Sequence, residues 1–139
     1  MRKLPLALLA SGAVVSAALA DPAPILSRAA VEGVARDAAS QALGKPVQLR
    51  VRRLAVQGRW AFVFAGLEAP GGGPVDYTGT PKADAAAHGM ASHDFAALLS
   101  KSDEGWSVVA EAVGPTDMPW ETWPQTYGAP AGLFVADRR

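Results

Sequence analysis

Two stretches of the sequence decide the fold, Gly58-Arg59-Trp60-Ala61-Phe62-Val63 and Gly105-Trp106-Ser107-Val108-Val109. Each places a tryptophan shortly after a glycine, at the head of an apolar run, and each follows a strand-like segment. A glycine turn between two apolar runs is typical of a β-hairpin. The sequence therefore predicts two hairpins, with both tryptophans anchored in the core.

The strand before the first turn carries an irregularity. Its apolar residues fall on odd positions up to Val51 and on even positions from Leu54 onward. Because side chains alternate between the two faces of a strand, one extra residue near Arg52-Arg53 would produce this change, so we predict a β-bulge there. The returning strand from Trp60 is apolar at both parities, which predicts a central strand covered on both faces.

A helix is predicted over residues 27–43, where small apolar residues recur at helical spacing and Ser27 can cap the first turn. The second hairpin is assigned to residues 95–101 and 106–113, although residues 96–99 would also suit a helix turn. On the last strand the even positions are apolar, so we expect Glu111 on the solvated face with Ser107; the alternative is that Glu111 faces a pocket.

A short aromatic helix is predicted near the C-terminus, capped by Thr116 or Asp117 and ended or kinked by Pro124. Its aromatic residues, at spacings of three and four, are Trp120, Trp123 and Tyr127. Three exposed rings would favour association, so we expect this segment to dock on the core.

Together these elements predict an α+β fold: an N-terminal helix packed on a four-stranded antiparallel meander, followed by a short aromatic C-terminal helix or tail. Residues 21–139 are expected to form a single domain. Within it, residues 66–92 make a long loop between the hairpins. Loops of this length are uncommon and are usually functional or disordered.

Residues 1–20 are typical of a cleavable signal peptide. Arg2 and Lys3 precede an apolar stretch that is short and rich in alanine, and Ala18-Leu19-Ala20 supplies small residues before the cut. We therefore expect a periplasmic or secreted protein with no stable membrane insertion after signal cleavage. The abundance of alanine, glycine, proline and arginine favours a bacterial source.

The composition and motifs of the chain exclude several classes of partner, nucleophile and cofactor. The formal net charge is zero, and cleavage after residue 20 would make the chain slightly acidic, which argues against nucleic acid as a partner. The absence of cysteine excludes disulfides, a thiol nucleophile and thiolate metal ligands. No phosphate-binding loop or dinucleotide fingerprint is present, so no cofactor is predicted.

The two tryptophan-led hairpins and the closing motifs Trp120-Glu121-Thr122-Trp123-Pro124 and Tyr127-Gly128-Ala129-Pro130 resemble those of an uncharacterised family of bacterial exported α+β proteins. This resemblance covers most of the mature chain and implies no activity. In outline, the order of elements is also similar to cystatin-like and nuclear-transport-factor-like folds. The chain lacks the inhibitory glutamine-valine-glycine loop of cystatins and has fewer helices than a nuclear-transport-factor cone, so neither function is carried over.

The long loop holds most candidate functional residues, and it is either a binding flap or a plain surface excursion. Asp76 and Tyr77 lie in its most structured piece and are candidate ligand-binding residues, as are His88 and His93 at its end. No metal site is assigned. The candidates for one are His88, Met90 and His93, because imidazole and thioether groups suit copper(I).

Trp120, Trp123 and Tyr127 are further candidate ligand-binding residues, since aromatic rings can stack on a sugar or grip an apolar side chain of a partner. Docking on the core is the alternative interpretation. Pro124 and Gly128 favour it, because they suit a fixed turn.

The sequence thus predicts an exported, non-enzymatic binding or interaction domain of the bacterial cell envelope, whose partner is a small molecule or another envelope protein. The alternative is a small periplasmic enzyme or a copper-handling protein that uses His88, His93 and Asp94, with Asp76 or Tyr77 as further candidates. No Gly-x-Ser-x-Gly or Ser-x-x-Lys motif supports a hydrolase. A catalytic histidine would need a carboxylate within hydrogen-bond reach in a pocket.

Overall fold

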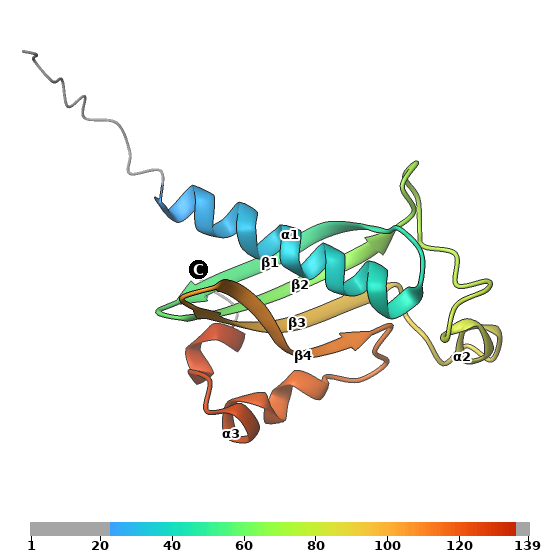
Figure 1. Ribbon diagram of the computed structural model, residues 1–139. Coiled ribbons are helices and arrows are strands. Elements are labelled where there is room, and N and C mark those ends of the chain that lie inside the picture. Colours follow the sequence, from blue (N-terminus) through green and yellow to red (C-terminus); the bar gives the residue numbers. More distant parts are fainter. Residues whose placement is uncertain (1–22, 136–139) are drawn as a thin grey trace, which may run out of the picture.

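The computed structural model describes residues 23–135 and contains one antiparallel sheet with helical elements on both faces (Figure 1). The predicted signal peptide, residues 1–20, lies outside the described residues. None of the helices in the described part of the chain is long and apolar enough to cross a membrane. The elements, in chain order, are α1 (Ala23–Leu43), β1 (Gln48–Gln57), β2 (Trp60–Glu68), α2 (Ala83–Ala87), β3 (Asp94–Ser102), β4 (Gly105–Val113), the 3-10 helix η1 (Pro119–Thr122), α3 (Trp123–Tyr127) and the 3-10 helix η2 (Ala131–Phe134).

The predicted α+β fold class is confirmed. The sheet order is β1-β2-β3-β4 and each strand is antiparallel to its neighbour, so the sheet is the expected meander. Both hairpin turns lie where the sequence places them, and each contains a glycine with positive φ, Gly58 at +60° and Gly105 at +109°. Other residues rarely adopt this conformation, so the two glycines define turns that fix the strand register.

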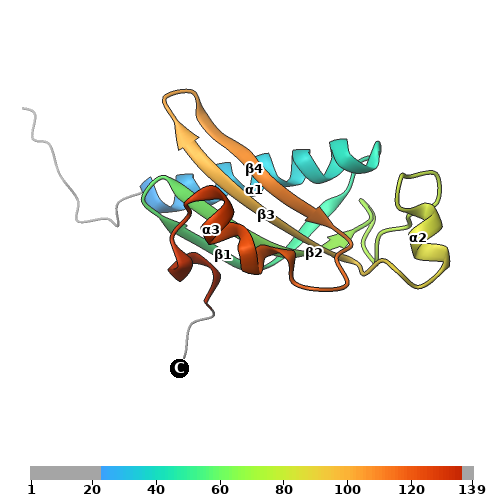
Figure 2. The same cartoon turned by 90° about the horizontal axis from the view of Figure 1, so that it is seen from below.

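The sheet has a different cover on each face. Figure 1 shows α1 across one face, and Figure 2 shows the C-terminal segment, residues 119–134 with η1, α3 and η2, on the other. Short alanine side chains let α1 pack closely on the sheet. The buried residues of α1 recur at every fourth position and are Val31, Ala35, Ala39 and Leu43.

The central strand β2 is buried on both faces, as predicted. Its odd positions face α1, whereas Phe62 faces the C-terminal segment. Phe62 is 2% exposed, and its ring centre lies 6.1, 6.3 and 4.7 Å from those of Trp120, Trp123 and Phe134. These contacts attach the C-terminal segment to the sheet.

The β-bulge predicted in β1 is confirmed. Val51 pairs with Ala65 and Arg53 pairs with Phe64, so Arg52 has no partner on β2. Leu49 and Val51 before the bulge and Leu54 after it therefore all face α1, in spite of their opposite parity.

The bulge also directs two consecutive arginines to the face of the C-terminal segment. The Arg52 guanidinium carbon lies 5.6 Å from the centre of the Phe64 ring, which belongs to that face. Arg53 Nη2 donates to the Leu133 carbonyl at 2.9 Å and also to the Val135 carbonyl. Arg53 therefore fixes the end of the C-terminal segment against β1.

A second bulge, in β4, was not foreseen from the sequence. Leu98 pairs with Ala110 and Leu99 pairs with Val108, so Val109 is the extra residue. Each residue of β4 after the bulge therefore points to the face opposite to the one that uninterrupted alternation would give it.

Glu111 is exposed, as expected, but because of this bulge it lies on the opposite face of the sheet from Ser107. Glu111 pairs with Ala97, on the face of α1, and lines a pocket of about 490 Å³ between α1 and β4. Ala38 and Ala42 of α1 also line this pocket. Partial burial raises the pKa of the Glu111 carboxyl.

The N-terminus of α1 differs from its prediction. The helix begins at Ala23, so Ser27 lies inside it and does not act as its cap. Pro24 falls in the first turn, where a missing N–H removes no intrahelical hydrogen bond. A helix can therefore start ahead of the residue that looks like a cap.

The predicted aromatic helix near the C-terminus is two shorter helical turns. η1 begins at Pro119 without a side-chain cap, so neither Thr116 nor Asp117 plays that role. Pro124 lies in the first turn of α3 and does not end it. Proline is well tolerated there because its fixed φ suits a helix start.

Replacing Phe62 by alanine should lower the free energy of unfolding by about 3–5 kcal/mol, because its ring fills the layer between β2 and the C-terminal segment. Urea denaturation followed by circular dichroism measures this loss. Val56, which is 40% exposed, is the control, and Val56→Ala should change the free energy by about 0.5 kcal/mol or less. Equal losses in the two variants would contradict the packing described.

Candidate binding site

The loop between β2 and β3 covers residues 69–93, because β2 continues to Glu68 and the loop begins later than predicted. Backbone hydrogen bonds attach both of its ends to Leu67 in β2. The Leu67 N–H donates to the His93 carbonyl at 2.7 Å, and the Leu67 carbonyl accepts the Val75 N–H at 3.2 Å. The loop, which includes α2, is thus held at one end of the sheet (Figure 1).

Tyr77 anchors the middle of this loop. Its side chain is 4% exposed, and its hydroxyl donates to the Ser92 carbonyl at 2.5 Å. Its ring stacks on His93, with ring centres 5.7 Å apart and an angle of 13° between the planes. Burial, assisted by the charge of Asp94, raises the pKa of Tyr77 to about 12, so the phenol stays a neutral donor.

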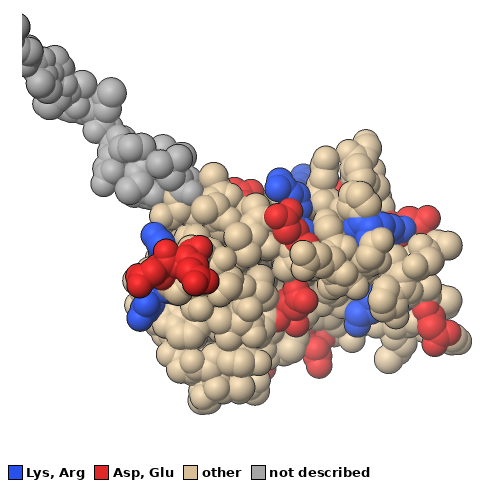
Figure 3. All heavy atoms as spheres, in the orientation of Figure 1, with Lys and Arg blue, Asp and Glu red and all other residues tan. Residues whose placement is uncertain are grey.

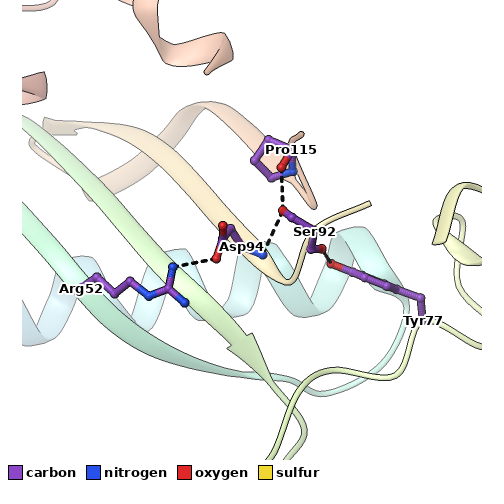
Figure 4. A network of polar contacts seen from close by, with 5 residues as sticks. All are labelled: Arg52, Tyr77, Ser92, Asp94 and Pro115. Carbon is purple, nitrogen blue, oxygen red and sulfur yellow. Dashed lines mark hydrogen bonds and ion pairs between the residues drawn. The ribbon is translucent and has the colours of Figure 1, made fainter. Parts of the chain in front are cut away.

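A network of polar contacts continues from the loop into the sheet (Figure 4). The Ser92 hydroxyl donates to the Pro115 carbonyl at 2.6 Å and accepts the Asp94 N–H at 3.2 Å. The Asp94 carboxylate accepts Arg52 Nη1 at 2.8 Å. The network therefore links the loop, the start of β3, the end of β4 and the bulge in β1.

Two glycines make room for these contacts. A Cβ on Gly66 would lie 3.3 Å from Arg52 Nη2, so glycine lets the arginine cross β2 toward β3. Gly114 has a φ of +62°, and a Cβ there would lie 3.1 Å from both the Ser92 carbonyl oxygen and the Tyr77 hydroxyl. Close approach and backbone conformation both require glycine at position 114.

An open pocket of about 350 Å³ lies within the loop, next to the start of β3, and we call it the loop pocket. Its volume is at the lower end of the range for small-molecule sites. It brings together three of the residues selected from the sequence, Asp76, Tyr77 and His93. Its other lining residues are Val75, Thr78, Ala83, Ala86 and Ala87.

Asp76 places a negative charge at the loop pocket. Hydrogen bonds from the Thr78 backbone and side chain, and the charge of Lys45, lower the pKa of Asp76, so its carboxylate is ionised at neutral pH. The backbone bond joins the Thr78 N–H to Asp76 Oδ1 at 2.9 Å. Lys45 Nζ donates to the Thr78 carbonyl at 3.2 Å and supports this turn from the end of α1.

His93 lies at the boundary between two pockets. Besides the loop pocket, it lines a neighbouring pocket of about 380 Å³ together with Arg50 and Arg52. The adjacent Asp94 points instead toward Arg52. Neighbouring strand residues alternate in direction, so these two residues do not form the acid–base pair that their adjacency would suggest.

His88 and Met90 lie outside the loop pocket. The His88 Nδ1 contacts the Asp84 carbonyl at 2.8 Å and its carboxylate at 3.8 Å, and the Met90 side chain is 64% exposed. Within residues 23–135, no group of three or more His, Cys, Asp or Glu could hold a metal ion. Copper binding by His88, Met90 and His93 stays a prediction.

The aromatic residues near the C-terminus pack on the sheet. The Trp120 ring centre lies 5.4 Å from that of Phe64, and Trp123 is buried with its ring edge-on to Phe62. Both tryptophans belong to the core layer on that face. Tyr127 is exposed, so it is the member of the set whose ring is open to solvent.

Sequence reasoning missed three parts of the site. Ser92 joins the loop to the sheet through both its carbonyl and its hydroxyl, and Gly114 contacts it from the end of β4. α2 supplies small alanine side chains to the pocket wall. The available signals were the Gly114-Pro115 turn, which breaks β4, and the alanine run of residues 83–87.

A scan against models of known protein families finds no match to this chain, and neither do searches of curated proteins and of solved structures. The likeness to cystatin-like and nuclear-transport-factor-like folds therefore stays a comparison of element order. Functional argument has to come from the site itself.

Gly114→Ala should destabilise the protein, because alanine would meet both an unfavourable φ and the contacts with Ser92 and Tyr77. Gly89→Ala is the matched control, since Gly89 has a φ of +71° but open space where the Cβ would lie. Chemical denaturation should show a loss greater for Gly114→Ala by about 1–3 kcal/mol. Equal losses would show that the close contacts at position 114 are absent.

The Tyr77 phenol should titrate with a pKa of about 12 in the folded protein. The chain has two tyrosines, so Tyr127→Phe leaves Tyr77 as its only phenol, and its near-ultraviolet absorbance reports ionisation. An exposed phenol titrates near 10, so the unfolded chain releases this proton first and stability falls as pH rises from about 10 to about 12. A midpoint near 10 while circular dichroism shows a folded protein would contradict the burial of Tyr77.

Proposed function

We propose that the chain is an exported binding domain of the bacterial cell envelope, and that its ligand occupies the loop pocket. The observation that carries this proposal is the convergence of Asp76, Tyr77 and His93 on one pocket. The loop that supplies all three is attached to the sheet by the Tyr77–Ser92 hydrogen bond and by backbone bonds to β2. Export rests on the sequence of residues 1–20.

The lining of the pocket indicates the chemistry of the ligand. Asp76 offers an ionised carboxylate, which favours an N–H donor or an ammonium group. His93 is exposed and offers an imidazole surface backed by the buried Tyr77 ring. The alanines of α2 leave space and add apolar surface. A small planar molecule that carries an amine or amide fits these features.

The surroundings of the histidines support binding over catalysis. Among the described residues, no carboxylate lies within hydrogen-bond distance of either imidazole, and the Asp84 oxygen nearest to His88 is 3.8 Å away. A general base normally needs such a partner to orient it and to stabilise its charged form. The pocket therefore supplies recognition groups but no acid–base pair.

A nuclear magnetic resonance screen with small planar amines and amides tests this proposal. Bound compounds should shift the backbone amides of residues 75–78, 83–87 and 93. His93→Ala should weaken binding about tenfold through loss of the stacking surface. His88→Ala, which removes an exposed imidazole outside the pocket, is the matched control and should leave the affinity unchanged.

In the same screen, Asp76→Asn removes the charge of this side chain but nearly preserves its shape. The amide keeps an oxygen that can accept the Thr78 N–H, so the turn is preserved while the charge is lost. Amines should then bind more weakly and neutral amides should be little affected. Hits that shift amides elsewhere, or that respond equally to His93→Ala and His88→Ala, would refute the proposal.

A further inference from the structure

A second pocket lies along β1, at the edge of the sheet, and we call it the arginine pocket. Its volume is about 660 Å³, within the range for small-molecule sites. It shares no lining residue with the loop pocket. Among the described residues, Arg28, Arg52 and Arg53 line it together with Phe64 and residues 54–56, and none of these lining residues is acidic.

The three arginines reach the pocket from two elements. Arg28 extends from α1, and its Nη1 donates to the Leu54 carbonyl at 3.1 Å. The bulge in β1 turns Arg52 and Arg53 to the same face, although consecutive strand residues normally point to opposite faces. The cluster is therefore a consequence of the fold and not of the sequence spacing alone.

Two of these guanidinium groups, those of Arg28 and Arg53, form no ion pair with any of the described residues. Each guanidinium has five N–H donors, and Arg28 and Arg53 bond to neutral carbonyls. Among the described residues, Asp94 is the only acid that forms an ion pair with any of the three arginines, and it pairs with Arg52 alone.

The arginine pocket is not part of a generally basic surface. The formal net charge of the chain is zero, and the face in Figure 3 carries basic and acidic side chains interspersed. A local excess of positive charge with free N–H donors, in a concave site, favours an anion.

We propose that the arginine pocket binds an oxyanion, a carboxylate or phosphate group of a small ligand, through Arg28 and Arg52. A guanidinium group presents two parallel N–H donors that match the oxygens of either anion. Arg53 adds charge and is held in place by the carbonyls at the end of the C-terminal segment. This site is independent of the loop pocket and of the function proposed for it.

Titration of the isotope-labelled protein with citrate and with inorganic pyrophosphate, at an ionic strength held constant with sodium chloride, tests this inference. Amide shifts should concentrate at residues 52–56, and the probe with the higher affinity identifies the preferred group. Arg28→Gln should weaken binding about tenfold, as expected for the loss of one charge-assisted contact. Arg36→Gln, which removes another exposed arginine of α1, is the control and should leave the affinity unchanged.

Arg28→Lys and Arg52→Lys extend the test, because they keep the charge but lose the paired donors. Both should bind more weakly than the parent protein while circular dichroism shows an unchanged fold. The inference is overturned if neither probe binds, if sodium chloride produces the same shifts, or if Arg28→Gln and Arg36→Gln have equal effects. His93→Ala should not alter binding of either probe, so failure of the two proposals can be told apart.

Discussion

The extra residue at Arg52 is the constraint on which the rest of the structure depends. Without it, the buried side chain of Leu54 would turn away from α1. The same insertion sends two consecutive arginines to the opposite face. There Arg53 holds the backbone of the C-terminal segment and Arg52 crosses Gly66 to Asp94. One local irregularity thus joins the α1 layer, the C-terminal layer and the loop network.

The position of the candidate site follows from the burial of β2. A strand that is apolar on both faces needs two covers, and the chain supplies α1 before the sheet and the aromatic C-terminal segment after it. Short turns join β1 to β2 and β3 to β4, so the connection between β2 and β3 is the only long loop within the sheet. The loop pocket forms there, at the end of the sheet.

The element order and both hairpins could be predicted from the apolar runs and the glycine turns between them. The first bulge could also be predicted, because β1 alternates between polar and apolar residues, so a change of parity is visible. The bulge in β4 could not, because Val108 and Val109 are equally apolar and the alternation shows no break. Asp76, Tyr77 and His93 could be named from the sequence. That these three residues line one pocket could not be predicted, because it depends on the path of the loop and on contacts between Tyr77 and Ser92.

Attachment of the loop to the sheet bears directly on binding. A flexible loop must lose conformational entropy when it closes on a ligand, and this loss offsets part of the binding free energy. Here Leu67 holds both ends of the loop, and Tyr77 is buried in its middle with its hydroxyl bonded to Ser92. The raised pKa of Tyr77 keeps this donor protonated at neutral pH. Contacts within the protein therefore order the pocket wall, so the contacts proposed for Asp76 and His93 with a ligand would contribute to affinity with little ordering to offset them.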